Sequence, residues 1–554
     1  MTAGVREQPR GACRPLPRPG TRLGLVGWLT GLTVLAGVGY RLWLLTHATP
    51  PTNSDEATMG LAALHIARGE DFPVWFYGQQ YMGPLEAYLA APVFAVAGPS
   101  LFGLRLPTLA LYALFLLLTW RLTLRLTGDR WFGLLVVALL ALGSDRVVKN
   151  QLIAGGGYPE MNAVGVALAL LAVDLAAGRP GCRLVRWATW GFLAGLLLWV
   201  DPLVLPYVAA TGAVLVAFRH RELRGRAGAL LGAAAVLGAA PLLAHSLLTG
   251  RNPLHAVLAA GGADATASWA DRLHGGLLLG PPLGMGFCGP GSCATWQLWW
   301  AYALPVLLLV AAGTAWWTLR HPPDSTGADG SAPRVAAALR LALVLAAVGT
   351  LGAYTVSSSS GLTPVESSRY LSTVLISVPA LLWPLWTLAR PGRGATAARP
   401  GPGWATTRSW PGWRVARPVA LVVLAATLVT AAHATIEAVR TASATRAAEA
   451  RHDELVATLR HLGVRHVRAG YWTCNRLTFA TAEEVVCAVV DDTLRPGFDR
   501  YPAYRREVDR AAAPAWVAPT GSPLAARLDE RLGAGPGDLD LVTVDGWRIY
   551  LPRG

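Results

Sequence analysis

Residues 23–56 read LGLVGWLTGLTVLAGVGYRLWLLTHATPPTNSDE. The stretch opens with an apolar run over residues 23–45, which is long enough to cross the hydrocarbon core of a membrane as a helix. It closes on Ser54, Asp55 and Glu56, a short way beyond that run. Adjacent carboxylates beside a membrane helix are costly unless they face water or a partner. The stretch therefore predicts a membrane protein with a polar site at the mouth of its first helix.

The composition extends this prediction to most of the chain. Hydrophobic residues make up 53% of the 554 positions and charged residues only 15%, whereas soluble domains carry roughly 25% charged residues. Apolar runs of spanning length recur as far as residue 437, so we expect a mainly α-helical, polytopic membrane helix bundle. The net charge of +15 does not indicate a nucleic-acid partner, because the arginines are spread over short loops between apolar runs.

The basic residues predict the orientation of the bundle. The sequence contains eleven candidate spans, at residues 23–45, 104–126, 131–148, 161–178, 187–202, 203–219, 227–248, 297–319, 336–356, 370–389 and 418–437. The first run is too long for a cleaved signal peptide. Alternating loops place 24 arginines on one side and six basic residues on the other, or eight if Arg41 and Arg105 are counted. Because basic loops stay in the cytoplasm, we expect a cytoplasmic tail (1–22), a transmembrane domain (23–437) and an extracytoplasmic C-terminal domain (438–554) in the cell membrane.

The first outer loop, residues 46–103, contains two expected helices that do not span. Residues 84–98 are apolar, but a span there would turn every later arginine-rich loop to the outside. Glu86, Tyr88 and Pro92 suit a shallow interfacial helix better. Residues 57–69 have helical amphipathic spacing and suit a short helix at the membrane surface, which Asn53, Ser54 or Asp55 could cap.

The last part of the chain has ordinary charge density and predicts a small α/β domain. We expect a helix over 447–462, strands over 464–471 and 539–551, and a tight turn at Asp545-Gly546. On the oxidising side of the membrane, disulfides are expected between the cysteines of each of two pairs, with the connectivity left open. The pairs are Cys288 with Cys293 and Cys474 with Cys487. Cys13 and Cys182 fall in cytoplasmic segments and are expected to need no partner.

Three acidic residues are candidates for catalysis. A carboxylate at the outer mouth of a helix can take a proton from a hydroxyl nucleophile, which is the role of a general base, and Asp55 and Glu56 fit it. The alternative is that Asp55 only caps the following helix, although one side chain can do both. Glu160 follows three glycines at 155–157 and faces the same side. Its alternative reading is a charge that stabilises a helix amino terminus.

Further residues are candidates for substrate binding. Glu366, Arg369 and Tyr370 open the tenth span, where a guanidinium could bind a phosphate in forked geometry; snorkelling of Arg369 to lipid headgroups is the alternative. Tyr81 and Glu86 could hold a polyhydroxylated ligand, whereas tyrosines also anchor proteins at the membrane interface. The sequence shows no metal-ligand spacing, glycine-rich phosphate loop or nucleotide-binding motif. It therefore names no cofactor and leaves a divalent metal open.

Several of these stretches together resemble the GT-C superfamily of polytopic glycosyltransferases, in the branch that includes protein O-mannosyltransferases and aminoarabinose transferases. The matching stretches are Asp55-Glu56, Ala67-Arg68-Gly69-Glu70-Asp71, Gly83-Pro84-Leu85, Leu101-Phe102-Gly103-Leu104-Arg105-Leu106-Pro107 and Arg369-Tyr370-Leu371. The resemblance covers residues 23–390. It implies inverting transfer of a sugar from a polyprenyl-phosphate-linked donor to an acceptor hydroxyl outside the membrane.

The resemblance also implies roles for particular residues. Asp55 would be the base, Arg369 would neutralise the departing lipid phosphate, and Glu160 would stand for the second-loop acid. Met82-Gly83-Pro84 departs from the family, because many relatives have a basic residue and a second proline there. The expected partners are membrane lipid, a polyprenyl-phosphate sugar, and a glycan, glycolipid or protein acceptor. A lipid-sugar transporter or flippase, which would favour inverted repeats, and a non-catalytic envelope scaffold are the alternative functions.

Overall fold

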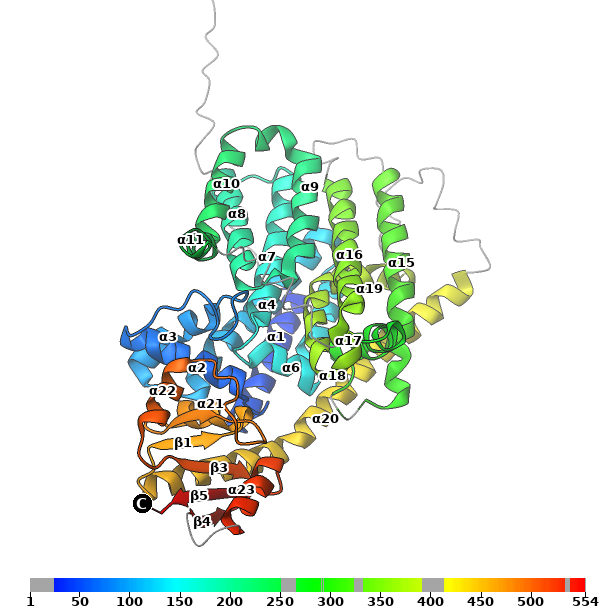
Figure 1. The fold of residues 1–554 in the computed structure, drawn as a ribbon. Helices are drawn as coiled ribbons and strands as arrows, with labels where there is room; N and C mark the ends of the chain where they lie inside the picture. Colours follow the sequence, from blue (N-terminus) through cyan, green and yellow to red (C-terminus); the bar gives the residue numbers. More distant parts are fainter. Residues whose placement is uncertain are drawn as a thin grey trace, which may run out of the picture.

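The protein consists of a bundle of apolar helices with a small α/β domain at one end (Figure 1). The computed structural model describes residues 24–250, 266–289, 291, 293–322, 332–390, 413–533 and 539–553. Within these residues, eight single helices are long and apolar enough to cross a membrane, or up to ten if two bent pairs each count as one span. The predicted fold class, a polytopic helix bundle with a small C-terminal α/β domain, is confirmed.

The eleven predicted spans all coincide with helices of the bundle. These helices are α1 (Leu25–Thr46), α4 (Leu101–Thr127), α5 (Arg130–Ala141) with α6 (Asp145–Leu152), α7 (Tyr158–Ala176), α8 (Arg183–Val200), η1 (Pro202–Val204) with α9 (Leu205–Leu223), α10 (Arg226–Gly238) with α11 (Ala240–Thr249), α15 (Trp299–Arg320), α16 (Ala332–Val356), η4 (Ser368–Ser377) with α19 (Val378–Ala389), and α20 (Trp413–His461). Helix α8 is not among the ten helices or helix pairs that are long and apolar enough to cross a membrane. The total of eleven membrane spans therefore stays a prediction.

Short helical turns fill the connections between the long helices. They are α13 (Trp269–Leu273), η2 (His274–Leu279), α14 (Gly280–Gly284), η3 (Thr295–Leu298), α17 (Ser358–Leu362) and α18 (Pro364–Ser367). The disulfide Cys288–Cys293 is present in this region, as predicted. Cys182 is also disulfide-bonded, so the expectation that it needs no partner is wrong. Cys13, for which the same was expected, lies outside the described residues. Loop charge predicts on which side of the membrane a cysteine lies, but it does not predict whether another cysteine lies close enough to form a disulfide.

One predicted span is sharply bent. Helices α5 and α6 meet at 92° where residues 131–148 were expected to form a single span. A break inside a bundle frees backbone groups that need new partners. Arg41, which is fully buried, donates to the carbonyl oxygens of Ala141 at 2.5 Å and Leu142 at 3.1 Å. The hydroxyl of Thr435 on α20 accepts the amide hydrogen of Gly143 at 2.9 Å. Side chains of α1 and α20 thus stabilise the bend.

The first loop contains the two expected short helices. Helix α3 (Leu85–Ala97) has 13 residues and includes Pro92, so it is too short to span. Helix α2 (Ser54–Arg68) ends at Gly69, whose φ of +73° suits a glycine. Helix α2 was expected at the membrane surface, but it is almost wholly buried between α3 and the C-terminal domain. It is buried because its small residues allow close packing on both sides.

The C-terminal domain is built on a mixed five-stranded sheet with the order β2-β1-β3-β5-β4. Its elements are β1 (His466–Ala469), α21 (Tyr471–Ala480), β2 (Val486–Val489), α22 (Pro502–Arg510), β3 (Ala515–Pro519), α23 (Pro523–Gly533), β4 (Leu539–Val544) and β5 (Trp547–Pro552). Strand β1 runs parallel to β2 and β3, and β5 runs antiparallel to β3 and β4. The β4–β5 hairpin turns at Asp545-Gly546, as predicted.

Two features attach this domain to the bundle. Helix α20 has 49 residues and runs from the bundle into the domain (Figure 1), so the predicted boundary at 437/438 falls inside one continuous helix. Helix α2 packs against α21 so closely that a Cβ on Gly60 would lie 2.5 Å from the Phe479 ring. The ring of Phe94 on α3 stacks on the other side of this contact, 6.1 Å from Phe479. The first loop and the C-terminal domain therefore share one apolar core.

Candidate active site

The amino-terminal end of α2 presents Asp55. The helix is capped by Asn53, whose side chain accepts the amide hydrogen of Glu56 at 2.9 Å. Capping therefore leaves the Asp55 carboxylate for other contacts, and its side chain is 23% exposed. Oδ1 of Asp55 accepts hydrogen bonds from the Tyr471 hydroxyl at 2.5 Å and from Nη2 of Arg500 at 2.7 Å. Asp55 thus lies at the junction of the first loop and the C-terminal domain.

Glu56 has a different environment from its neighbour. Its side chain is fully buried, and its two oxygens accept hydrogen bonds from Nε and Nη2 of Arg105 at 2.7 and 2.6 Å. Arg105 on α4 is only 1% exposed. A bidentate, buried pair of this kind is strong and geometrically specific. The Glu56 carboxylate is therefore occupied in joining α2 to α4, which leaves it no free oxygen to serve as the base that the sequence predicted.

The glycines at 155–157 bring a second acidic segment to Asp55. The Cα of Gly155 faces the backbone of Asp55 and Glu56, since a Cβ built there would lie 3.5–3.7 Å from their main-chain atoms. Oε1 of Glu86 accepts the amide hydrogens of Gly155, Gly156 and Gly157, at 3.2, 3.4 and 2.8 Å. Burial raises the pKa of Glu86, and these hydrogen bonds oppose the rise. Glu86 therefore fixes the glycine loop instead of projecting into solvent.

Glu160 lies close behind this loop, in the first turn of α7. It is 1% exposed, and neither of its carboxylate oxygens has a hydrogen-bond partner among the described residues. Oε2 of Glu86 is likewise buried and unpartnered there. Glu160 lies within electrostatic reach of Glu86. Buried polar atoms without partners are uncommon in folded proteins and usually have an explanation in function or in a bound group. The two glutamates therefore place three buried carboxylate oxygens without a partner among the described residues beside the glycine loop.

Arg369 connects the far end of the chain to the same place. It lies within electrostatic reach of Tyr158, Tyr370 and Asp55, and its guanidinium carbon lies 5.5 Å from the centre of the Tyr370 ring. Tyr81 is close to Arg369 and Tyr370, and burial raises its hydroxyl pKa. The structure thus brings Asp55, Arg369, Tyr370 and Tyr81 into one region. Glu366, one helical turn before Arg369, is exposed and lies within reach of Arg146.

Two cations that were not predicted from the sequence belong to this region. Arg146 and Lys149 on α6 both lie within electrostatic reach of Arg369. The Nε atoms of Arg146 and Arg369 are buried and have no hydrogen-bond partner in the part of the chain that the structure describes. Polar residues over 144–151, directly after an apolar run, were the available signal. The three basic side chains together form a region suited to an anion.

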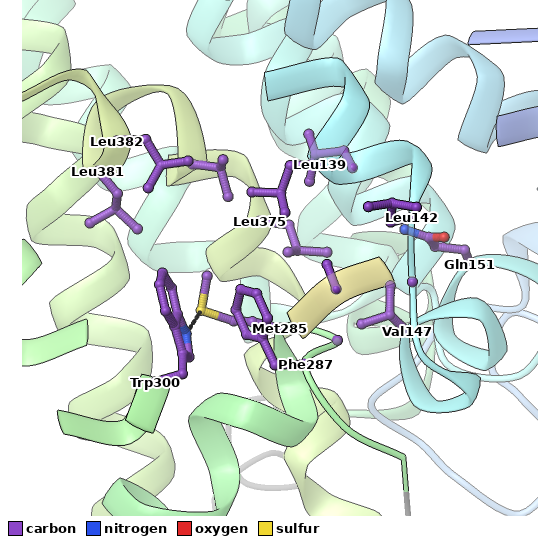
Figure 2. Close-up of a pocket in the computed structure, with 15 residues that line it drawn as sticks. Leu139, Leu142, Val147, Gln151, Met285, Phe287, Trp300, Leu375, Leu381 and Leu382 are labelled. Atoms are coloured by element: carbon purple, nitrogen blue, oxygen red, sulfur yellow. Dashed lines mark hydrogen bonds between the residues drawn. The ribbon is translucent and has the colours of Figure 1, made fainter. Parts of the chain in front are cut away.

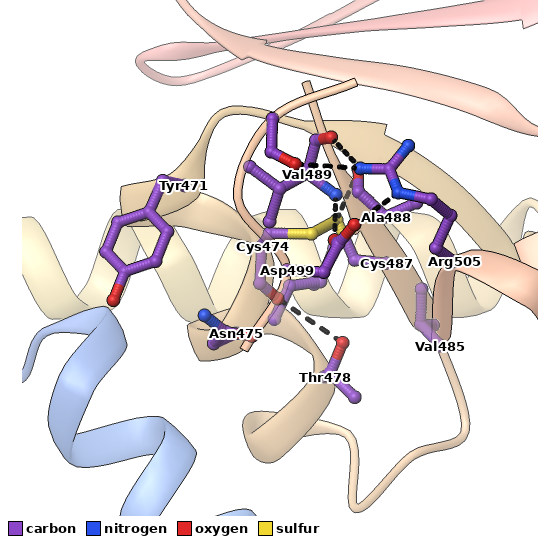
Figure 3. Close-up of a disulfide and its surroundings, with 12 residues drawn as sticks. Tyr471, Cys474, Asn475, Thr478, Val485, Cys487, Ala488, Val489, Asp499 and Arg505 are labelled. Carbon is purple, nitrogen blue, oxygen red and sulfur yellow. Dashed lines mark hydrogen bonds and ion pairs between the residues drawn. A yellow bond between two sulfur atoms is a disulfide. The ribbon is translucent and has the colours of Figure 1, made fainter. Parts of the chain in front are cut away.

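Tyr471 and Arg500 were also missed, and they come from the C-terminal domain. Figure 3 shows Tyr471 at the start of α21 with its hydroxyl pointing towards the blue helix α2. The disulfide Cys474–Cys487, which was predicted, joins α21 to strand β2 next to it. The Ser54 hydroxyl donates to the Tyr471 carbonyl at 2.5 Å and accepts from Nδ2 of Asn475 at 2.9 Å. No local motif links these residues to Asp55, because more than 400 positions separate them.

One group of side chains in the described residues has the spacing of a metal site. Ligand atoms of His65, Glu70 and Glu483 lie within 4.8 Å of one another at the opposite end of α2 from Asp55. Arg68 forms ion pairs with both glutamates. Nε2 of His65 is already hydrogen-bonded to Glu483 at 2.8 Å. A guanidinium therefore already supplies the positive charge, and we assign no metal to this group.

Comparison with known proteins identifies the fold. No protein-family model and no curated protein sequence matches the chain. The chain shares its fold with solved structures of ArnT, in line with the fold that the sequence resemblance implies. The structure of ArnT from Cupriavidus metallidurans bound to undecaprenyl phosphate matches with a TM-score of 0.54 and 13% sequence identity, over 95% of this chain and 98% of that chain. ArnT from the same organism in the apo state matches with a TM-score of 0.51 and 13% identity, over 94% and 98%.

Proposed function

We propose that this membrane protein transfers a sugar from a polyprenyl-phosphate-linked donor to an acceptor hydroxyl. The observation that carries the proposal is that Arg369 lies within electrostatic reach both of the Asp55 carboxylate and of two further basic side chains, Arg146 and Lys149. A reaction that removes a proton from a hydroxyl and releases a phosphate needs both kinds of group. ArnT, which has the same fold, binds undecaprenyl phosphate. On the charge pattern of the loops, this end of the bundle faces the outside of the cell membrane.

The elements that carry the cations also bring apolar side chains together around a small hollow. This hollow lies between α5, α6, the residues that follow α14, α15, η4, α19 and α20. Val147, Met285, Phe287, Trp300 and Leu375 are among its lining residues, and Figure 2 shows their side chains around it. Arg146 and Lys149 flank Val147 on α6, while Arg369 precedes Leu375 on η4. The apolar side chains beside the cations therefore suit the lipid part of an amphiphilic donor whose phosphate binds at the cations.

The proposed chemistry is a single displacement. Asp55 accepts the proton of the acceptor hydroxyl as the hydroxyl oxygen attacks the anomeric carbon of the sugar. The bond between that carbon and the phosphate oxygen breaks, and the leaving phosphate takes the electron pair. Arg369, with Arg146 and Lys149, stabilises the negative charge that develops there. Attack from the side opposite the leaving group inverts the configuration of the anomeric carbon.

The remaining residues of the region are suited to hold the sugar. The unpartnered carboxylate oxygens of Glu160 and Glu86 can accept hydrogen bonds from sugar hydroxyls. Tyr81 and Tyr370 offer rings and hydroxyls beside Arg369. The exposed position of Glu366 gives it the weakest claim to a binding role among the residues proposed from the sequence. The acceptor, a glycan, a glycolipid or a protein, would approach through the partly exposed side of Asp55.

The proposal is tested by replacing Asp55 with Asn in the full-length protein. Membranes that contain the variant are supplied with radiolabelled polyprenyl-phosphate sugars, and label in acceptor fractions is measured. We expect at least about a 100-fold loss of transfer, as is typical when a general base is removed. Asp509→Asn is the matched control, because Asp509 is a half-exposed carboxylate in an ion pair with Arg468, away from the site. Unchanged transfer by Asp55→Asn would contradict the assignment of the base.

A further inference from the structure

The C-terminal domain reaches the proposed base with two side chains. The Tyr471 hydroxyl and Nη2 of Arg500 both donate hydrogen bonds to Oδ1 of Asp55. No hydrogen bond from the described residues reaches the other carboxylate oxygen, Oδ2. The 23% exposure of Asp55 leaves this carboxylate accessible. One oxygen is therefore held while the other is available to an acceptor hydroxyl.

Arg500 is itself rigidly placed. Its side chain is only 6% exposed, and Nη1 donates to the carbonyl oxygen of Tyr77 at 3.0 Å. Its guanidinium carbon lies 4.5 Å from the centre of the Phe76 ring. The backbone on both sides is close, because a Cβ on Gly78 would lie 3.3 Å from the Arg500 Cα. Nε of Arg500 also donates to the Tyr471 hydroxyl oxygen, so the two residues fix each other.

The hydrogen bonds from Tyr471 and Arg500 to Asp55 are not needed to hold the C-terminal domain on α2. The domain already packs on α2 through Gly60 and Phe479. Glu483 binds His65 and Arg68 at the far end of the same helix. A buried arginine and a tyrosine hydroxyl that converge on one oxygen of one acid are a more specific arrangement. It is what fixes a carboxylate rotamer, and preorganised groups of this kind let a functional side chain act without reorganisation.

We propose that Tyr471 and Arg500 are positioning residues, supplied by the C-terminal domain, that hold the Asp55 carboxylate with Oδ2 directed to the acceptor hydroxyl. The inference rests on the proposed function. It assigns the C-terminal domain a part in the reaction, since the base is held in place only when that domain is docked. The two residues act through Asp55 and do not themselves contact the reacting atoms.

The test compares three variants of the full-length protein in membranes: Tyr471→Phe, Arg500→Gln and Arg500→Lys. Misplacement of a catalytic group by about 1 Å can cost on the order of 100-fold in rate. We expect Tyr471→Phe and Arg500→Gln to lower kcat about 10- to 100-fold, with the KM for the lipid-linked donor unchanged, because the donor's phosphate site is intact. Arg500→Lys, which keeps a positive charge beside Asp55, should recover part of the loss seen in Arg500→Gln.

Two controls separate positioning from docking. Arg468→Gln removes an arginine of the same domain that pairs with Asp509 at 3.0 Å and does not contact α2, and it should leave kcat unchanged. Glu483→Gln weakens the docking contacts at the far end of α2 without touching Asp55. If Glu483→Gln lowers kcat as much as Tyr471→Phe does, the contacts serve docking alone and the inference is overturned.

The remaining outcomes distinguish this inference from the proposed function. Loss of transfer in Asp55→Asn, together with full kcat in Tyr471→Phe and Arg500→Gln, would overturn the positioning role and leave the proposed function standing. Full transfer in Asp55→Asn would overturn the assignment of Asp55 as the base, and with it the positioning role, while the transfer activity itself would stand. Loss in all three, with the partial recovery by Arg500→Lys and an unchanged donor KM, is the expected result.

Discussion

Asp55 and Glu56 are neighbours in the chain, yet the fold treats their carboxylates in opposite ways. Consecutive residues of a helix point about 100° apart, as 3.6 residues per turn require. Asp55 consequently faces the C-terminal domain and remains partly exposed, whereas Glu56 faces α4 and is fully buried against Arg105. The sequence marks the acidic pair but cannot say which acid is buried, because Arg105 lies 49 positions away.

The burial of this ion pair leads to a stability prediction. Removing one partner of a buried pair leaves an uncompensated charge, which typically costs about 3–5 kcal/mol. We expect Arg105→Met to destabilise the protein by about this amount, and the double variant Arg105→Met with Glu56→Gln to recover part of it. Chemical unfolding in detergent measures the effect. Arg440→Met is the control, because its pair with Glu437 is largely exposed and such pairs contribute about 0–1 kcal/mol. Equal effects at the two sites would contradict this account.

At the scale of elements, α2 joins two parts of the molecule. Its apolar periodicity predicts a helix, and the capping residues and Gly69 predict its ends within a few residues. Its burial could not be predicted, since the partner helix α21 begins more than 400 residues later. The same limit applies to the bend between α5 and α6. A hydropathy pattern shows one apolar run there, while the bend depends on Arg41 and Thr435 from distant helices.

Gly60 tests the contact between α2 and α21. A methyl group at this position would lie 2.5 Å from the Phe479 ring, so Gly60→Ala must displace the ring or separate the helices. Overpacking of this kind typically costs about 1–3 kcal/mol. We expect faster amide hydrogen exchange in α2 and α21. Gly39→Ala on α1 is the control, because no atom lies within 4 Å of its added Cβ, and it should leave exchange in both helices unchanged. Unaltered exchange in Gly60→Ala would show that the contact is looser than described.

At the scale of the whole molecule, the docking of the C-terminal domain should depend on pH. Burial alone would raise the pKa of Glu483, but hydrogen bonds from His65 and Tyr504 and the charge of Arg68 outweigh it, and the net pKa is lowered. A carboxyl whose folded pKa lies below its unfolded value of about 4.3 contributes stability above that value, and loses it as pH falls through the folded pKa. Docking should therefore weaken below about pH 4.

This pH dependence is measured by hydrogen exchange of α2 and α21 between neutral pH and pH 3, corrected for the intrinsic pH dependence of exchange. The unaltered protein should lose protection at the acidic end. In Glu483→Gln, protection at neutral pH should be lower, but it should change less with pH because this variant has no carboxyl to protonate. Arg68, Tyr77 and Asp71 surround the same network and stay in place in both proteins. An equally steep acidic loss in Glu483→Gln would assign the dependence to another group.

The general architecture was readable from the sequence, because apolar run length and loop charge report on the membrane directly. The resemblance to a glycosyltransferase fold also came from local stretches, such as those around Asp55 and Arg105. What the sequence could not provide was the assembly of the site across the chain. Arg146 and Lys149 lie at the polar end of the run over residues 131–148 that was predicted as a span. Tyr471 and Arg500 lie in a domain whose placement no local pattern encodes.

The continuity of α20 has a mechanical consequence. At 1.5 Å per residue, its 49 residues form a rod about 70 Å long, with one end among the apolar helices and the other in the core of the C-terminal sheet. A tilt of only about 5° at the membrane end would carry the far end through about 6 Å, roughly twice the length of a hydrogen bond. A change in bilayer thickness that alters the inclination of α20 is therefore expected to shift the C-terminal domain relative to Asp55.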